Sequence, residues 1–465
     1  MNIYQIKIST GIFGLAFSTA AIFAASPVWT GGGDNANWST AANWDSGVAP
    51  VPGDPVEKMI PTEDSLTFGG TRQLSTHNDL EFGYFAGITF LAGGFTLDGT
   101  APGLTGNIES TGDNTINPGL VLGGQGLRQI GSAEGGTLTI NGSLNFQGAS
   151  LQDNSAGIAI YNAAFTGGGV FRVFSTGSAV LGADNSNFDG AIQVFRFAKL
   201  AHPKGLGGPF TTVTLDRSYG NAALELNGLD ITGVSVSFTS AEVSDSSLRA
   251  RLRNTSANAA TLDGDVELVV TGGIDGDGDM TLSGTISGNR AGLVKEGKGS
   301  LRLTGANTFT GGLQVDGGTV LANNTGGSAA GGGPVTVAAG ATFGGTGSVA
   351  GNLILNGGSI APGDGKIGTL TVGGNATWNG GGPWQFELGS GGASDKLMVS
   401  GNLIKGTGSG FVFDFLNSQA TGNHVLLNFA RNTGFVAGDF ACINLPPGRT
   451  GTFQLTDRQL NIVVK

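Results

Sequence analysis

Three carboxylates at alternate positions are the strongest candidate for metal chemistry in this chain of 465 residues. Asp275, Asp277 and Asp279 are separated by single glycines, and alternate carboxylates can converge on one hard cation such as Ca²⁺. An EF-hand loop requires glycine at 280 and an acid at 286, where the chain has Met280 and Ile286. The spacing therefore favours an acidic turn, and a calcium site is the weaker alternative.

Three arginines could bind an anion. Arg249, Arg251 and Arg253 alternate with apolar residues, so on a β-strand they would share one face. The run 262–268 repeats this alternation with acids in place of the arginines. We expect the two runs to be neighbouring strands that carry an exposed ion-pair ladder. Antiparallel pairing would match Arg253 with Asp263, Arg251 with Asp265 and Arg249 with Glu267.

Two alternatives to this antiparallel ladder remain open. Parallel pairing of the two runs at a constant offset of 14 residues also aligns the opposite charges. The functional alternative is that the arginines bind an acidic polysaccharide, using guanidinium groups that match carboxylates in shape and charge. We rank this alternative below the ladder, because the nearby acids would neutralise the arginines locally.

Tryptophans form two groups amid asparagine, serine, threonine and glycine. Trp29, Trp38 and Trp44 follow the first 26 residues closely, and Trp378 and Trp384 flank a glycine-rich turn. Exposed indoles beside amides can stack on sugar rings, which makes all five candidates for polysaccharide binding. The apolar interior of a repetitive β-structure must also be covered at its ends, and we favour this capping role for both groups.

Catalytic constellations are mostly absent. The three histidines, His77, His202 and His424, lie in dissimilar surroundings, and no G-x-S-x-G nucleophile motif occurs. A carboxylate pair for glycoside cleavage stays open, because the 34 acids allow many pairs and only geometry can select one. We expect no catalysis and no cofactor.

The elements that would position these residues are short β-strands. Between 293 and 320 every second residue is apolar within short runs, and each run ends in glycine. Glycine makes up 86 of 465 residues, and charged residues are 12% where about 25% is ordinary. The stretch 309–315 also matches the stretch 188–194, 121 residues earlier. This text predicts a repetitive β-solenoid.

The chain begins with features of an exported protein. Lys7 is the only charged residue before an apolar run from 11 to 25, which predicts a secretory signal peptide over 1–25 with cleavage near Ala24 or Ala25. A single cysteine, Cys442, can form no internal disulfide, and no later segment is apolar enough to span a membrane as a helix. The net charge of −11 argues against nucleic acid as a partner.

A family resemblance rests on residues between 293 and 320. They follow the core of the autotransporter-associated β-strand repeat, also called the passenger-associated transport repeat, at Lys295, Gly297, Gly299, Leu301, Leu303, Gly305, Asn307, Phe309, Gly311 and Gly312. The resemblance implies a right-handed parallel β-helix on an exported or surface protein. The text after 400 stays glycine-rich up to the final predicted strand at 460–464, and we recognise no membrane barrel of amphipathic strands in it.

These observations predict an all-β protein with three parts. They are a signal peptide at 1–25, a tryptophan-rich cap at 26–70, and a β-solenoid at 71–465 with repeats near 177–210 and 291–340. The function we expect is that of a secreted or surface-displayed structural or adhesive protein, with extracellular polysaccharide or cell-surface components as partners. The alternative is a polysaccharide-binding or polysaccharide-cleaving β-helix protein.

Overall fold

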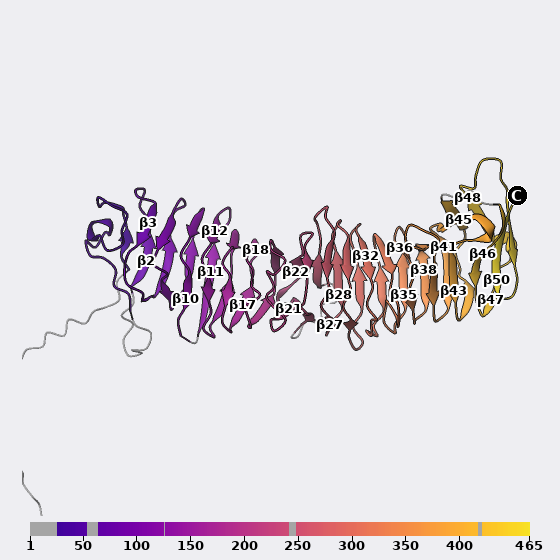
Figure 1. Cartoon of the computed structure of the whole chain (residues 1–465), viewed down its shortest axis with the longest axis horizontal. Coiled ribbons are helices and arrows are strands. Elements are labelled where there is room, and N and C mark those ends of the chain that lie inside the picture. Colours follow the sequence, from indigo (N-terminus) through magenta and orange to yellow (C-terminus); the bar gives the residue numbers. More distant parts are fainter. Residues whose placement is uncertain (1–25, 54–63, 125, 241–247, 417–420) are drawn as a thin grey trace, which may run out of the picture.

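The computed structural model describes residues 26–53, 64–124, 126–240, 248–416 and 421–465, so the leader predicted for 1–25 lies outside the described residues. These residues form a long rod in which the strands lie across the axis and the chain advances along it (Figure 1). They contain no α-helix, and the prediction of an all-β parallel solenoid is confirmed. Short 3-10 turns occur at η1 (Ala41–Asn43), η2 (Arg217–Tyr219), η3 (Ser390–Gly392) and η4 (Ala437–Asp439).

Sheet A forms one wall of the N-terminal and middle parts of the rod. Each strand between its two end strands pairs in parallel with the strand one turn before it and the strand one turn after it. Its strands, in order along the axis, are β1 (Val28–Trp29), β2 (Ser65–Phe68), β5 (Gly87–Phe90), β8 (Ile108–Ser110), β11 (Leu127–Ser132), β14 (Ser150–Asp153), β17 (Val170–Val173), β19 (Ala191–Val194), β21 (Thr212–Asp216), β24 (Val236–Thr239), β27 (Val266–Leu268) and β30 (Ile286–Ser287).

Sheet B is a second parallel wall and runs almost the whole length of the rod. Its strands, in order along the axis, are β3 (Ser75–Asn78), β6 (Thr96–Gly99), β9 (Asn114–Ile116), β12 (Thr137–Ile140), β15 (Ile158–Tyr161), β18 (Ser178–Leu181), β20 (Phe197–Leu200), β22 (Ala222–Glu225), β25 (Ala250–Arg253), β28 (Gly272–Asp275), β31 (Leu293–Lys295), β33 (Leu313–Val315), β35 (Val335–Ala338), β38 (Leu353–Gly357), β41 (Ala376–Gly381), β44 (Asn402–Lys405) and β47 (Arg431–Thr433).

Four shorter sheets complete the walls. Sheet C contains β4 (Tyr84–Phe85), β7 (Gly103–Leu104), β10 (Leu120–Leu122), β13 (Leu144–Asn145) and β16 (Phe165–Thr166). Sheet D contains β23 (Asp230–Ile231), β26 (Ala260–Leu262), β29 (Met280–Leu282), β32 (Ser300–Leu303), β34 (Thr319–Ala322), β36 (Thr342–Gly345) and β39 (Ser359–Pro362). Sheet E contains β37 (Ser348–Val349), β40 (Thr369–Val372), β43 (Lys396–Val399), β46 (Gly422–Asn428), β50 (Gln459–Val464) and β49 (Gly451–Leu455), and sheet F contains β42 (Trp384–Glu387), β45 (Phe411–Leu416) and β48 (Phe440–Ile443).

Alternation along each strand builds the core. In β32, Leu301 and Leu303 are buried while Ser300 and Arg302 are partly exposed. Leu301 has Met280 as its register partner in the preceding turn, so the buried side chains form columns along the axis. Burying one such side chain contributes about 1.5–3 kcal/mol, and the columns repeat this contribution turn after turn.

Glycine is required at corners where successive turns come close. Gly276 and Gly297 both have positive φ, at 111° and 68°. A Cβ on Gly297 would lie 2.4 Å from the Gly276 carbonyl oxygen, and one on Gly276 would lie 2.1 Å from the Asn254 carbonyl oxygen. Both the backbone conformation and the close approach therefore exclude side chains at this stacked corner.

The two repeat copies recognised in the sequence lie on different walls. In the first copy, 191–194 forms β19 of sheet A and the next strand, β20, lies in sheet B. In the second copy, 313–315 forms β33 of sheet B and the next strand, β34, lies in sheet D. The repeated text therefore specifies a local loop–strand–strand unit, whichever wall the unit occupies.

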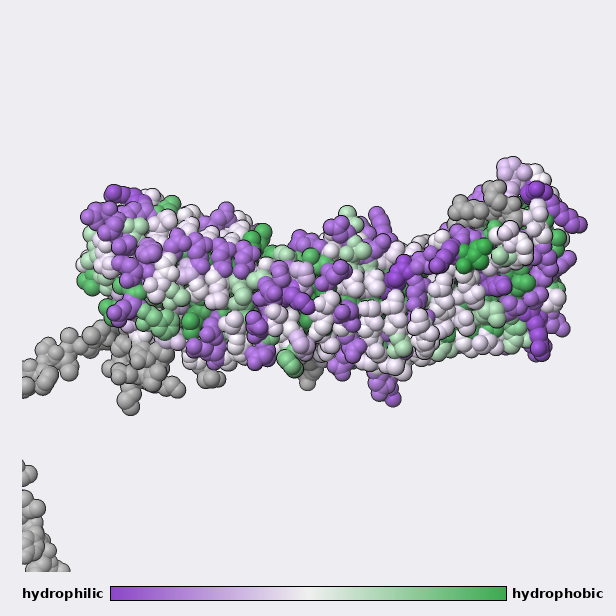
Figure 2. Space-filling model, in the orientation of Figure 1, coloured by the Kyte–Doolittle hydropathy of each residue, from purple (hydrophilic) through white to green (hydrophobic). Residues whose placement is uncertain are grey.

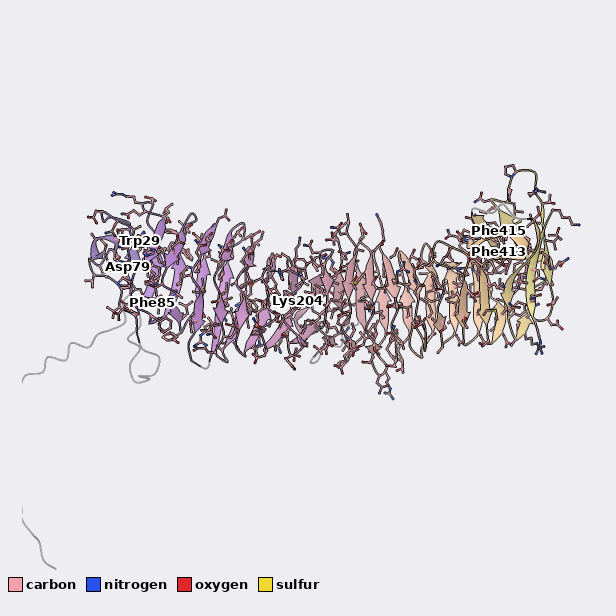
Figure 3. The ribbon with its side chains drawn as sticks, in the orientation of Figure 1. Trp29, Asp79, Phe85, Lys204, Phe413 and Phe415 are labelled. Atoms are coloured by element: carbon pink, nitrogen blue, oxygen red, sulfur yellow. The ribbon has the colours of Figure 1, made fainter. Side chains whose placement is uncertain are left out.

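The C-terminal end departs from the parallel rule. β46 pairs antiparallel with β50, and β50 pairs antiparallel with β49. Beside these strands, Phe413 and Phe415 lie near the end of the rod, while Trp29 lies at the opposite end (Figure 3). Aromatic side chains therefore cover the apolar interior near both ends.

Candidate functional site

The three arginines Arg249, Arg251 and Arg253 lie on the outer face of sheet B, in the middle of the rod. Leu252 of β25 is fully buried, whereas Arg251 and Arg253 are partly exposed. Arg249 directly precedes this strand and is also partly exposed. The alternation read from the sequence therefore places the guanidinium groups outside the core.

The predicted ion-pair ladder is wrong. Strand β25 pairs in parallel with β22 and β28 of sheet B, whereas β27, which carries Glu267, pairs with β24 and β30 of sheet A. Arg251 and Asp265 therefore lie on segments that do not pair. The physical reason is that a solenoid sends successive strands to different walls, so that neighbours on one wall are a full turn apart in sequence.

The arginines instead pair with acids of later turns. Arg251 Nε lies 2.8 Å from Glu296 Oε2, and Arg249 Nε lies 3.7 Å from Glu296 Oε1. Arg253 Nε lies 3.4 Å from Asp275 Oδ2. The five side chains of these pairs are 18–32% exposed, and each pair of this kind contributes about 0.2–1 kcal/mol.

A glycine allows Arg251 to reach across one strand. Its register partner in β28 is Gly273, and a Cβ at this position would lie 2.9 Å from Arg251 Cγ. Because Gly273 has no side chain, the arginine stem lies over the backbone and extends to Glu296 in the following turn. Asn221, in the preceding turn, holds Arg251 from the side opposite Glu296. Its Oδ1 accepts from the backbone N–H of Arg249 at 3.0 Å and from Arg251 Nη1 at 2.9 Å.

These contacts border an open groove on the surface. Its volume is about 450 Å³, and it is lined by Asn221, Ala223, Arg251, Arg253, Asp275 and Glu296. The lining holds two guanidinium groups and two carboxylates, whose formal charges balance, and Arg249 pairs with Glu296 beside the groove. A groove with guanidinium and amide groups can bind a carboxylate and sugar hydroxyls.

The three aspartates of the acidic turn accept hydrogen bonds from neighbouring backbone N–H groups. Asp275 Oδ1 accepts from the Gly276 N–H at 2.7 Å, and Asp279 Oδ1 accepts from the Ser300 N–H at 2.8 Å. Asp277 Oδ1 accepts a longer bond of 3.4 Å from the Lys298 N–H. Among the described residues, no three or more His, Cys, Asp or Glu side chains lie together in a way that could hold a metal ion. This arrangement favours the acidic-turn interpretation.

The tryptophans of the first group are all buried. Trp29, Trp38 and Trp44 are 0–2% exposed and meet edge to face, with ring centroids 5.2 Å apart for Trp29 and Trp44. Trp44 Nε1 donates to the Trp38 carbonyl at 2.8 Å, and Trp38 Nε1 donates to Thr76 Oγ1 at 3.0 Å. No face of these indoles is free to stack on a sugar, which favours the capping interpretation.

The second tryptophan group is buried as well. Trp378 and Trp384 are 0% exposed and stack with ring centroids 3.8 Å apart. Phe413 packs edge to face against both rings, at 5.7 and 5.8 Å. Their burial again favours capping, and a ligand role for either group stays a prediction that the burial does not support.

Sequence reasoning missed an aromatic column outside the core. Phe174 and Phe195 directly follow β17 and β19, and their rings stack with centroids 4.4 Å apart. Tyr219, in η2, packs edge to face on both rings at 5.1 and 5.5 Å and is 58% exposed. The signal available in the sequence was aromatic residues repeating at intervals of 21 and 24 residues, close to one turn of the solenoid.

No helix among the described residues is long and apolar enough to cross a membrane. On the face drawn in Figure 2, hydrophobic residues form small separate groups among hydrophilic and neutral ones.

The chain is similar to known exported proteins over part of its length. The family model of the passenger-associated-transport-repeat matches residues 293–322. The autotransporter adhesin BmaC of Brucella suis biovar 1 is 36% identical over 114 residues, which cover 24% of this chain and 3% of the adhesin. An extracellular serine protease of Serratia marcescens is 31% identical over 172 residues, which cover 37% of this chain and 15% of the protease. The matched regions are thus a small part of both relatives.

Proposed function

We propose that this chain, which carries a passenger-associated transport repeat at 293–322, acts outside the cell as a passenger-like β-solenoid with a structural or adhesive role. The observation that carries the proposal is the position of the repeat within the fold. The matched residues form β31, β32, β33 and β34, four consecutive strands that continue sheets B and D without a break. The repeat is therefore an integral part of the solenoid.

The shape of the molecule supports an adhesive role. A solenoid gains length with each turn, since strands of successive turns lie about 4.8 Å apart, and it presents a long continuous surface. The adhesin of Brucella suis carries a related sequence, but it is a far longer protein, so its activity supports the proposal only by analogy.

Cell fractionation tests the export on which the proposal depends. The full chain would be produced in a Gram-negative host beside a variant that lacks residues 2–25. We expect the full chain in the envelope or culture fluid, with a mature N-terminus between residues 25 and 28, and the variant in the cytoplasm. Recovery of the full chain in the cytoplasm with Met1 intact would contradict the proposal.

A polysaccharide-active protein is the second candidate. The groove beside Arg251 favours it, because guanidinium and amide groups are exposed together there. Incubation of the purified chain with bacterial and plant polysaccharides, scoring both retention and release of reducing ends, separates binding from cleavage. Retention without reducing ends identifies a binding protein, and reducing ends identify a polysaccharide-cleaving enzyme.

A further inference from the structure

The aromatic column lies where the chain turns from sheet A to sheet B. Val173 and Val194 are register partners at the ends of β17 and β19, and Phe174 and Phe195 continue this alignment beyond the strands. None of Phe174, Phe195 and Tyr219 belongs to the buried core. Three aromatic side chains in successive turns thus form a column on the outside of the wall, with Tyr219 as its most exposed member.

An arginine without a described partner lies beside this column. Arg196 directly follows Phe195 and is partly exposed, and among the described residues its guanidinium group has no hydrogen bond or ion pair. The group lies over Gly220, where a Cβ would be 2.4 Å from Arg196 Nη1. Gly220, at φ 128°, directly follows Tyr219 in the chain, so the guanidinium group lies against the backbone next to this residue.

The column continues into the arginine groove. Asn221 lies two residues beyond Tyr219 and binds both the Arg249 N–H and Arg251 Nη1. The Ala223 N–H donates to the Arg196 carbonyl at 2.6 Å, which joins the two turns. The turns that contain Phe174, Phe195, Tyr219 and Arg249 are successive. With Arg196 and Asn221 these residues form a surface strip about 14 Å long, at about 4.8 Å per turn.

Among the described residues, the acids near these arginines already have partners. Asp216 Oδ1 accepts from the Ser218 N–H at 2.8 Å, and its Oδ2 accepts from the Thr239 hydroxyl at 3.2 Å. Glu296 pairs closely with Arg251 and only at 3.7 Å with Arg249. Arg196 and Arg249 are therefore the two guanidinium groups of the strip that remain best able to bind an external anion.

We propose that this strip, made of Phe174, Phe195, Tyr219, Arg196, Asn221 and Arg249, binds an acidic polysaccharide of the uronate type along the rod axis. An exposed aromatic ring packs against the C–H face of a sugar, and a guanidinium fork binds a carboxylate in two hydrogen bonds. A neutral polysaccharide would leave the arginines without partners, and a polyanion without sugar rings would not use the aromatic column. The inference rests on the proposed extracellular function and names its ligand class.

Binding measurements on purified mature chain test the proposal. The probes are oligogalacturonate, neutral maltoheptaose and polyacrylate, a polyanion without sugar rings, titrated by calorimetry at low and moderate salt. We expect oligogalacturonate to bind, maltoheptaose to bind far more weakly, and any binding of polyacrylate to be independent of Tyr219.

Two variants and two matched controls locate the site. Tyr219→Ala and Arg196→Gln should each weaken oligogalacturonate binding about tenfold, as expected for the loss of one stacking or charge-assisted contact. Phe210→Ala, at an 83% exposed ring, and Arg431→Gln, at an exposed arginine near the C-terminus, should change it less than twofold. Circular dichroism of each variant checks whether the fold is kept.

The outcomes separate this inference from the function on which it rests. No binding of oligogalacturonate, or equal weakening by the control variants, overturns the strip even if the chain is exported and adhesive. Equal binding of maltoheptaose, or a Tyr219→Ala variant that binds as the parent does, also overturns it. Cytoplasmic location of the full chain would overturn the extracellular function, while the binding data would still report on the strip.

Discussion

Asn185 and Asn307 make the same pair of hydrogen bonds in two distant turns of the rod. The Asn185 side-chain oxygen accepts from the Phe165 N–H at 2.8 Å, and its amide donates to the Gly205 carbonyl at 2.7 Å. Asn307 accepts from the Ile286 N–H at 2.7 Å and donates to the Ala329 carbonyl at 2.6 Å. Each buried asparagine thus joins the turn before it to the turn after it.

Removal of either asparagine amide should destabilise the rod. Asn185→Ala and Asn307→Ala leave a buried N–H and a buried carbonyl without a partner, so we expect each to lower the free energy of unfolding by about 1–3 kcal/mol. Urea unfolding followed by circular dichroism measures the change. Asn289→Ala, at an exposed position, should stay within about 0.5 kcal/mol, and equal midpoints for all three variants would disprove the role of the asparagines.

Asp153 and Tyr161 form a second polar contact inside the rod. Tyr161 donates its hydroxyl to Asp153 Oδ2 at 3.0 Å, both residues are 0% exposed, and burial raises the pKa of the Asp153 carboxyl. Tyr161→Phe removes a donor from a buried acid and should cost about 1–3 kcal/mol of unfolding free energy. Tyr219→Phe, which removes a hydroxyl from an exposed ring, is the matched control. A loss no larger than that of the control would contradict the contact.

Asp395 should make stability depend on pH. Burial, with a smaller effect of the Glu387 charge, raises the pKa of this carboxyl to about 6, although its oxygens accept from the Gly368 and Glu387 N–H groups. Between pH 4 and pH 6 the folded chain holds a proton that the unfolded chain releases, so this group's contribution to stability falls as pH rises through that window.

The measurement for Asp395 compares wild type with Asp395→Ala at several pH values. The difference between their urea midpoints should shrink from pH 4 to pH 6 and stay constant above pH 7. A difference that grows with pH would mean that the pKa of Asp395 is lowered, against the burial argument.

A Glu296→Gln variant tests whether Glu296 competes with an external carboxylate for Arg249 and Arg251. Glu296→Gln removes the carboxylate shared by Arg249 and Arg251, and the partly exposed pairs imply a stability loss below about 1 kcal/mol. Its affinity for oligogalacturonate should rise, since two guanidinium groups lose their internal partner. Glu134→Gln, at an exposed acid in the N-terminal half, should leave both properties unchanged, and a fall in affinity for Glu296→Gln would count against the strip.

Local sequence patterns predicted which side chains of a strand face outward, but they did not predict which strands lie beside it in the sheet. The alternation around Arg251 and the glycines at 276 and 297 follow from period-two packing and from corners that exclude side chains. Strand partners depend instead on the length of each turn, which varies. Arg251 pairs with Ala223, 28 residues earlier, and with Gly273, 22 residues later, so no constant offset could have matched it to Glu296.

The same variation concealed the aromatic column. Phe174, Phe195 and Tyr219 are separated by 21 and 24 residues, and η2 brings Tyr219 back over the rings of the two earlier turns. The tryptophans were candidates for sugar stacking because indoles are large and amphipathic. Their size equally suits the covering of an open core, and only burial distinguishes the two uses.

Accessibility on intact cells tests the central claim most directly. A short epitope inserted after Gly326, in an exposed loop between β34 and β35, should not disturb either strand, because loop tips of this kind tolerate insertion. If the chain acts as an extracellular solenoid, an antibody will label intact producing cells or detect the protein in the culture fluid. Labelling only after the cells are lysed, with residues 1–25 still attached, would contradict the account.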